Sequence, residues 1–224
     1  MNIDSLNQTI IYCRKCPRLV EYRESVAKKK KKAFLDWNYW GRPVPAFGDI
    51  SGRILVVGLA PGVHGSNRTG RMFTGDASGV FLFAALHKAG FANQAESTNR
   101  DDGLRLNDLL ISAVCRCAPP DNKPNRSEIS NCLPYLVQEI NFMKNLQGLV
   151  ALGRLAFENI LGIYRAKGVT VARFDFKHGG MYSLGDDLPW LVASYHPSQQ
   201  NTQTGRLTVE MFDQMWHKAK SRLV

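Results

Sequence analysis

The stretch that most constrains the fold runs from Arg53 to Gly79. It opens with a short apolar run, Ile54 to Val57, which predicts a buried strand. Six glycines follow between positions 58 and 79, and apolar residues at helical spacing resume only at Val80. A strand that leads through a glycine-rich loop into a helix places backbone amides and a helix N-terminus beside one crevice. In α/β sheets, ligands bind in that crevice, at the carboxyl ends of the strands.

The rest of the chain continues to alternate strands and helices. Further buried strands are predicted at 109–114, 148–152 and 190–195, with a possible edge strand at 169–174. Helices are predicted at 80–89, 127–144, 154–161 and 208–222, and over parts of 2–27. We therefore expect an α/β protein with three layers (α/β/α) and a central, mostly parallel sheet of four strands. No internal repeat or domain boundary is visible, so we expect a single domain over residues 1–224.

The glycine-rich loop lacks both common phosphate-binding motifs, because it contains neither Gly-Lys-Ser/Thr nor GxGxxG. It instead resembles the first motif of the Fe–S-containing uracil-DNA glycosylases, where a strand leads into Gly-x-Ala-Pro-Gly and then Gly-Arg-x-Phe-x-Gly. Here these segments are 58–62 and 70–75. The longer string from His64 to Asp76 resembles the family 5 (type B) branch, since family 4 carries Glu where this chain has Leu59.

Charge and composition agree with a DNA partner. Lys and Arg number 29 against 19 Asp and Glu, for a net charge of +10, which favours a polyanionic partner. The resemblance implies that this partner is DNA containing uracil or other deaminated bases. No apolar run reaches membrane-spanning length and no signal segment is apparent, so we expect a cytoplasmic protein without a membrane partner, and a monomer. The five lysines Lys28–Lys32 predict a solvated, mobile segment that is also compatible with phosphate contacts.

Five cysteines in a reducing compartment favour metal ligation or free thiols over disulfides. Cys13 and Cys16 form a CxxC pair, and Cys117 and Cys132 flank a proline-rich loop. The spacing alone favours a metal site but leaves zinc and iron both open. The resemblance implies that these four cysteines ligate a structural [4Fe–4S] cluster. Cys115, at the end of a predicted strand, is then a free buried thiol.

Breaking an N-glycosidic bond leaves positive charge on the sugar and negative charge on the base. The site therefore needs a carboxylate or a positioned water near the sugar, and a hydrogen-bond donor near the base oxygen. Asp76 precedes a predicted helix, so it is either an N-cap or, as the resemblance implies, the catalytic carboxylate. Asn122 is a second candidate to hold the water, or else a turn former. His196, in a Ser-Tyr-His-Pro-Ser segment, resembles the second motif of the family, whose imidazole stabilises the leaving base.

The resemblance also implies a base pocket and a DNA surface. The expected substrate-binding residues, with Phe73 stacking on the base, are Gly58, Ala60, Gly62, His64 and Phe73. Family 4 has a base-recognising Asn where this chain has Ala113, which implies a broader range that includes hypoxanthine and xanthine. The polar loop after His196 is expected to enter the duplex. The expected DNA contacts are Arg68, Arg71, Ser198, Gln199, Gln200 and Arg206.

The sequence thus predicts a monofunctional DNA glycosylase that starts base-excision repair by releasing uracil and other deaminated bases with an Asp-assisted water. Two alternatives of other classes remain. One is a non-catalytic Fe–S nucleic-acid-binding protein of the same fold, and the other is a nucleotide-binding α/β enzyme that uses the glycine-rich loop for phosphate.

Overall fold

A computed structural model of the protein describes residues 2–170 and 173–224. Its centre is a six-stranded sheet with the order β1-β3-β2-β4-β6-β5. The four inner strands are parallel to one another. They are β2 (Ile54–Gly58), β3 (Leu109–Ala113), β4 (Gly148–Leu152) and β6 (Trp190–Ser194). Two-residue strands, β1 (Phe47–Gly48) and β5 (Met181–Tyr182), pair antiparallel at the two edges.

The four predicted strands are confirmed as the parallel centre of the sheet, and the edge strands raise the total from the expected four to six. Of the possible edge strand at 169–174, residues 171 and 172 lie outside the described residues, and the described positions around them carry no strand. The edge beside β6 is instead occupied by β5.

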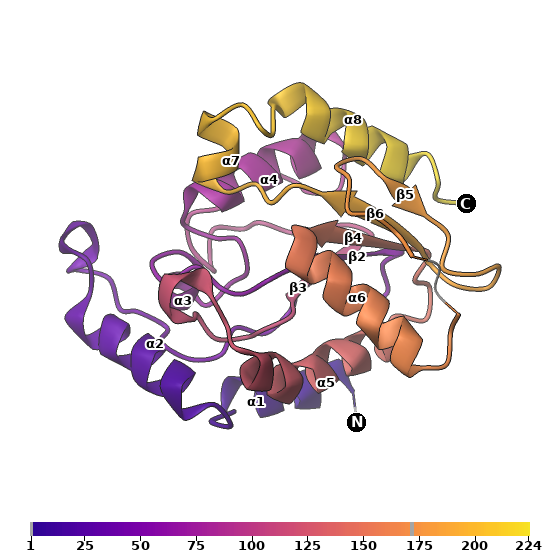
Figure 1. Cartoon of the computed structure of the whole chain (residues 1–224). Helices are drawn as coiled ribbons and strands as arrows, with labels where there is room; N and C mark the ends of the chain where they lie inside the picture. The colour runs from indigo at the N-terminus through magenta and orange to yellow at the C-terminus, as the bar shows by residue number, and fades with distance from the viewer. Residues whose placement is uncertain (1, 171–172) are drawn as a thin grey trace.

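Helices cover both faces of the sheet, which confirms the three-layer prediction (Figure 1). On one face lie α4 (Ala77–Lys88) and α8 (Val209–Lys220), and on the other lie α5 (Arg126–Phe142) and α6 (Arg154–Ala166). The helix α1 (Ile3–Ile11) packs on α5, and α2 (Pro17–Lys29) extends away from the sheet beside it. Short helical turns complete the chain: η1 (Lys32–Phe34), α3 (Ser66–Thr69), η2 (Pro120–Asn122) and α7 (Gln199–Gln203).

The inner strands are buried on both faces, which explains their continuous apolar sequences. Successive residues of β2 point to opposite faces. Ile54 and Val56 pack in the core beneath α4 and α8, whereas Leu55 and Val57 pack in the core beneath α5 and α6. This burial fixes the register of β2 and therefore fixes where the glycine-rich loop leaves the sheet.

The helix α6 continues past the glycine that was expected to end it. The sequence predicts an end at Gly162, but the helix runs to Ala166 because Ile163 and Tyr164 bury apolar side chains on the sheet. An interior glycine lowers helix stability, and a Cβ built at Gly162 meets no atom within 4 Å.

We therefore expect Gly162→Ala to raise the free energy of unfolding by about 0.4–1 kcal/mol. The gain comes from the lower conformational entropy of the unfolded chain, since no contact is made or lost. Urea denaturation followed by circular dichroism measures it. A destabilised variant would show that the helix is strained at this position.

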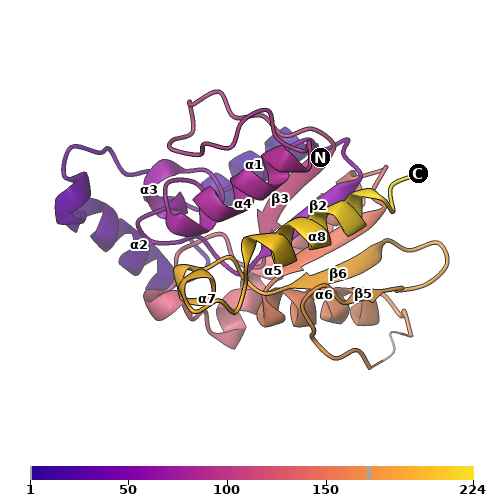
Figure 2. The ribbon, with the colours of Figure 1, turned by 90° about the horizontal axis from the view of Figure 1, so that it is seen from above.

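The carboxyl ends of the parallel strands all point to one side of the molecule. The turns α3 and α7 lie beyond these ends, opposite the side that carries both chain termini (Figure 2). The helix α4 starts there as well, at Ala77 rather than at the predicted Val80, because the Asp76 side chain caps it. No helix within the described part of the chain is long and apolar enough to cross a membrane.

Candidate active site and cysteine cavity

A pocket of about 710 Å³ opens at the carboxyl ends of the strands, within the range of roughly 300–1,000 Å³ that is typical of small-molecule sites. Its wall combines the loop after β2, the start of α4, the end of β3, the η2 turn and the loop after β6. Most of the residues expected to act on the base line it: Ala60, Gly62, His64, Phe73, Asp76, Asn122 and His196. Ala113 lines it too, and brings no polar group.

Asp76 is both a helix cap and a pocket residue. One carboxylate oxygen, Oδ1, accepts a hydrogen bond of 3.0 Å from the backbone N–H of Gly79. The other oxygen, Oδ2, occupies space that only glycines leave open, since a Cβ at Gly62 or Gly65 would lie 2.8 Å or 1.9 Å from it. Burial raises the pKa of Asp76, while the backbone N–H groups and Arg68 act against that rise. The two interpretations of Asp76 are therefore compatible.

Phe73 and His196 form the aromatic part of the pocket. Their rings are stacked, with centroids 5.8 Å apart and planes at 29°. The Phe73 ring lies so close to Gly58 that a Cβ there would stand 2.9 Å from it. Phe73 has a φ of 51°, a left-handed conformation that is uncommon for a bulky residue and recurs at functional sites. Burial lowers the pKa of His196 to about 4, so its imidazole is neutral at pH 7.

The η2 turn brings polar groups to the pocket from beyond β3. Asp121 and Asn122 both line it and both have positive φ angles, of 53° and 56°. Asn122 is therefore both a turn residue and a pocket residue, just as Asp76 is both a helix cap and a pocket residue. The exposed Asn122 side chain makes no hydrogen bond to the described residues, which leaves its amide free to bind a ligand or water.

The polar segment after His196 forms the short helix α7 at the pocket rim. Ser198 caps this helix, and Ser198, Gln199 and Gln200 line the pocket. Arg206 follows the helix as an exposed residue, with its guanidinium 4.7 Å from the centre of the Tyr195 ring. The segment is thus placed next to any molecule that enters the pocket.

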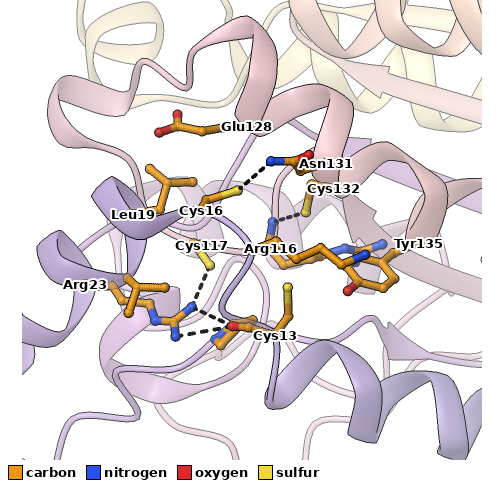
Figure 3. Close-up of a pocket in the computed structure, with 13 residues that line it drawn as sticks. Cys13, Cys16, Leu19, Arg23, Arg116, Cys117, Glu128, Asn131, Cys132 and Tyr135 are labelled. Carbon is orange, nitrogen blue, oxygen red and sulfur yellow. Dashed lines mark hydrogen bonds between the residues drawn. The ribbon is translucent and has the colours of Figure 1, made fainter.

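A second cavity gathers four of the five cysteines. Cys13 and Cys16 come from the junction of α1 and α2, Cys117 from the loop after β3 and Cys132 from α5. Figure 3 shows their sulfur atoms arranged around one centre. Cys115 is buried outside the lining of this cavity. Within the described residues, no three or more His, Cys, Asp or Glu side chains are arranged so that together they could hold a single metal ion.

Hydrogen-bond donors lie close to three of these sulfurs. Nitrogen donors reach three of them: Arg23 Nη1 at 2.8 Å from Cys117, the Arg116 backbone N–H at 3.2 Å from Cys132, and Asn131 Nδ2 at 3.6 Å from Cys16 (Figure 3). A hydrogen bond from Cys115 lowers the pKa of Cys132 to about 7, whereas burial raises the pKa of Cys117 to about 12. Arg23 is 2% exposed, and its buried charge lies 3.5 Å from the Glu24 carboxylate and 2.8 Å from the Cys117 sulfur.

Comparison with known proteins identifies the family. A sequence profile described as "Uracil DNA glycosylase superfamily" matches residues 45–220. The chain belongs to this superfamily. It is 49% identical over 220 residues to the type-5 uracil-DNA glycosylase of Thermus thermophilus, covering 98% of each chain. It is 44% identical to the type-5 enzyme of Pyrobaculum aerophilum, covering 96% of this chain and 91% of that one, but 32% identical to a type-4 enzyme of the same organism, covering 72% and 65%.

These comparisons confirm the resemblance to the type-5 branch of the uracil-DNA glycosylase superfamily. Membership of this superfamily makes the chain an enzyme of the N-glycosylase class, a group of hydrolases. The family profile begins at residue 45, so it covers the pocket and two of the cavity cysteines but leaves out Cys13 and Cys16. The match to the Thermus thermophilus relative is longer than the profile match and covers 98% of the chain.

The structure corrects two of the expected DNA contacts of this superfamily member. Arg68 and Arg71 are 3% and 4% exposed and are engaged inside the protein. The Arg68 guanidinium lies between the rings of Phe34 and Trp37, 3.9 Å and 4.0 Å from their centres. Arg71 forms two hydrogen bonds of 2.7 Å to the Asp102 carboxylate. Neither guanidinium is free to bind a phosphate.

Sequence reasoning missed the contacts that hold the glycine-rich loop in place. Arg68 donates hydrogen bonds of 2.7 Å to the carbonyls of His64 and Gly75, next to Asp76. Tyr39, 8% exposed, places its hydroxyl 3.1 Å from His64 Nδ1. The close spacing of four aromatic residues, Phe34, Trp37, Tyr39 and Trp40, was the available signal. The lysine run is also more ordered than predicted, since Lys28 and Lys29 belong to α2 and Lys32 to η1.

Proposed function

We propose that the protein is a monofunctional glycosylase that hydrolyses the N-glycosidic bond of uracil and of other deaminated bases, hypoxanthine and xanthine, in DNA and so starts base-excision repair. One observation carries the proposal: a buried carboxylate, a neutral imidazole and an aromatic ring meet in one pocket of nucleoside size. The names of the type-5 relatives agree with it. To reach such a pocket, the damaged nucleotide must leave the DNA stack.

Different pocket residues stabilise the positive and the negative charge that bond scission creates. The ionised Asp76 faces the sugar, stabilises its developing positive charge and, with Asn122, holds the attacking water. The neutral His196 donates an N–H to a base oxygen and stabilises the departing anion. Phe73 packs against the base, and Gly58, Ala60 and Gly62 allow the backbone to approach it. The lack of a polar group at Ala113 supports a pocket that accepts pyrimidines and purines alike.

We also propose that Cys13, Cys16, Cys117 and Cys132 hold a [4Fe–4S] cluster. The shared cavity, the nitrogen donors around the sulfurs and the buried charge of Arg23 support this assignment. When bound, the cluster supplies a structural bridge between the α1–α2 junction, the loop after β3 and α5, and no redox step. It would thereby fix the position of the η2 turn, which carries Asn122.

The DNA surface is proposed around the pocket mouth. Ser198, Gln199 and Gln200 contact the strand that flanks the flipped nucleotide, and Arg206 contacts a phosphate. Lys28–Lys32 contribute sequence-independent attraction to DNA. The same proposal takes the chain as a single domain over residues 1–224 that acts as a monomer in the cytoplasm.

Incubation with damaged oligonucleotides tests the function. We expect the purified protein to convert duplexes with one uracil, hypoxanthine or xanthine to abasic products that alkali then cleaves. Matched duplexes with cytosine, adenine or guanine should stay intact, and no strand break should form before alkali. Tight DNA binding without base release would favour the non-catalytic Fe–S nucleic-acid-binding protein. Binding of free nucleotides without base release would favour the nucleotide-binding enzyme.

A further inference from the structure

The aromatic segment 34–40 packs behind the pocket loop. Trp40 and Gly41 donate backbone hydrogen bonds of 2.9 Å and 3.0 Å to the carbonyls of Arg68 and Asn67 in α3. Phe34 and Trp37 enclose the guanidinium of Arg68. Because these contacts join two segments that are far apart in the sequence, the aromatic segment fixes the position of the loop that carries His64.

His64 is held at both its backbone and its ring. Its carbonyl accepts the 2.7 Å hydrogen bond from Arg68 Nε, and its Nδ1 lies 3.1 Å from the hydroxyl of Tyr39. The two rings meet edge to face, at an interplanar angle of 82°. The imidazole therefore has a defined orientation at the pocket wall.

The hydrogen bonds around Tyr39 favour one tautomer of His64. The Tyr39 oxygen accepts from the backbone N–H of Lys31 at 3.4 Å, so its own hydrogen is available to His64 Nδ1. Burial, Lys31 and Arg68 lower the pKa of His64, which keeps the imidazole neutral at pH 7. A neutral imidazole that accepts at Nδ1 carries its hydrogen on Nε2. Within the described residues Nε2 has no partner, and His64 lines the pocket, so this N–H is a donor available to a bound base.

Such a donor separates a deaminated base from the amine-bearing base from which it arose. Deamination replaces an exocyclic amine, itself a donor, by a carbonyl oxygen, an acceptor, in cytosine, adenine and guanine alike. A fixed N–H donates a hydrogen bond to that oxygen but leaves an amine unpaired, which costs binding energy. Ala113 offers no group for this purpose, so His64 would supply this donor in addition to the one proposed on His196.

We infer that Tyr39 is a positioning residue that fixes His64 as an Nε2–H donor, and that this donor recognises the carbonyl oxygen of the deaminated base. The inference rests on the proposed function for its substrate. The proton assignment itself is a property of the free protein.

Long-range ¹H–¹⁵N spectra of the histidine rings test the assignment without any reaction. In the wild-type protein, the His64 nitrogens should show the shifts of an Nε2–H tautomer. In Tyr39→Phe the Nδ1 shift should move, because its hydrogen bond is lost. Tyr12→Phe removes the hydroxyl of an exposed tyrosine and should leave the spectrum unchanged. An Nδ1–H tautomer in the wild type, or no change in Tyr39→Phe, would overturn the assignment.

A double-mutant cycle on single-turnover base release tests the role. Tyr39→Phe should slow release by about 10–100-fold, as the loss of partners that orient a functional histidine typically does. His64→Ala should slow it more, and Tyr39→Phe should add nothing in the His64→Ala background. Equal effects of Tyr39→Phe in both backgrounds would mean a merely structural role and would refute the inference. Wild-type protein that releases no base would instead refute the proposed function, while leaving the proton assignment to the spectra.

Discussion

Asp76→Asn is expected to slow single-turnover release of uracil and of hypoxanthine alike, by about 100- to 1,000-fold, the usual cost of removing one preorganised electrostatic group. Both bases leave through the same sugar cation, so loss of the carboxylate charge affects them equally. Asn is as good an N-cap as Asp, so α4 should stay intact and the melting temperature should change little. Rates on matched oligonucleotides that differ only in the damaged base measure the effect.

Two companion variants show which property of Asp76 matters. Gly65→Ala keeps the carboxylate but places a Cβ 1.9 Å from its Oδ2. It should reproduce much of the Asp76→Asn effect by displacing the charge. His196→Ala should instead slow release to a degree that depends on the base, because the oxygen that His196 contacts is placed differently in pyrimidines and purines. Full activity in Asp76→Asn would reduce Asp76 to a helix cap and leave Asn122 as the residue that holds the water.

The same carboxylate should set the acid limb of the pH profile. Only ionised Asp76 stabilises a cation, and burial raises its pKa above the usual 3.8. The single-turnover rate should therefore fall as the pH drops through this raised pKa, starting at a higher pH than an exposed Asp would give. In Asp76→Asn the limb should disappear.

The sequence predicted the sheet and the pocket better than it predicted their support. Strands such as β2 and β4 are continuous apolar runs, so burial alone reveals them. His196 follows β6 closely, and Asp76 lies between the loop after β2 and the start of α4, which places both at the carboxyl ends of the strands. The end of α6 was misplaced because Gly162 weakens a helix locally, whereas burial of Ile163 and Tyr164 outweighs that cost only in the folded chain.

The arginines show what local sequence leaves open. An arginine beside a glycine-rich loop is predicted from the sequence to contact phosphate. The sequence does not reveal whether its guanidinium is already paired with another side chain in the folded protein. Arg68 contacts Phe34 and Trp37, and Arg71 hydrogen-bonds to Asp102, in each case about thirty residues away in the sequence. Such pairs depend on the tertiary structure, so the two roles became visible only with the fold. The position of Tyr39 behind His64 is hidden for the same reason.

Replacement of any one of Cys13, Cys16, Cys117 and Cys132 by Ala is expected to abolish the brown colour of the purified protein and most of its solubility. Metal binding to such a set contributes to folding, and these four residues join three segments that are distant in the sequence. Loss of one ligand should release the α1–α2 junction from α5 and disturb the sulfur cluster that Arg23 contacts, which leaves Glu24 as the main counter-charge of this buried cation. Iron and sulfide analysis, visible absorption and the soluble fraction measure the outcome.

Cys115→Ala provides the matched control. Cys115 is fully buried, lies two residues before Cys117 in the sequence, and contacts Cys132 without lining the cavity. Its replacement removes a small buried group and a hydrogen bond to a proposed ligand, so it should lower stability but keep colour and iron content. Loss of iron in Cys115→Ala alone would move the third ligand from Cys117 to Cys115. A colourless wild-type protein with stoichiometric zinc would refute the cluster altogether and leave the four thiolates as a zinc site.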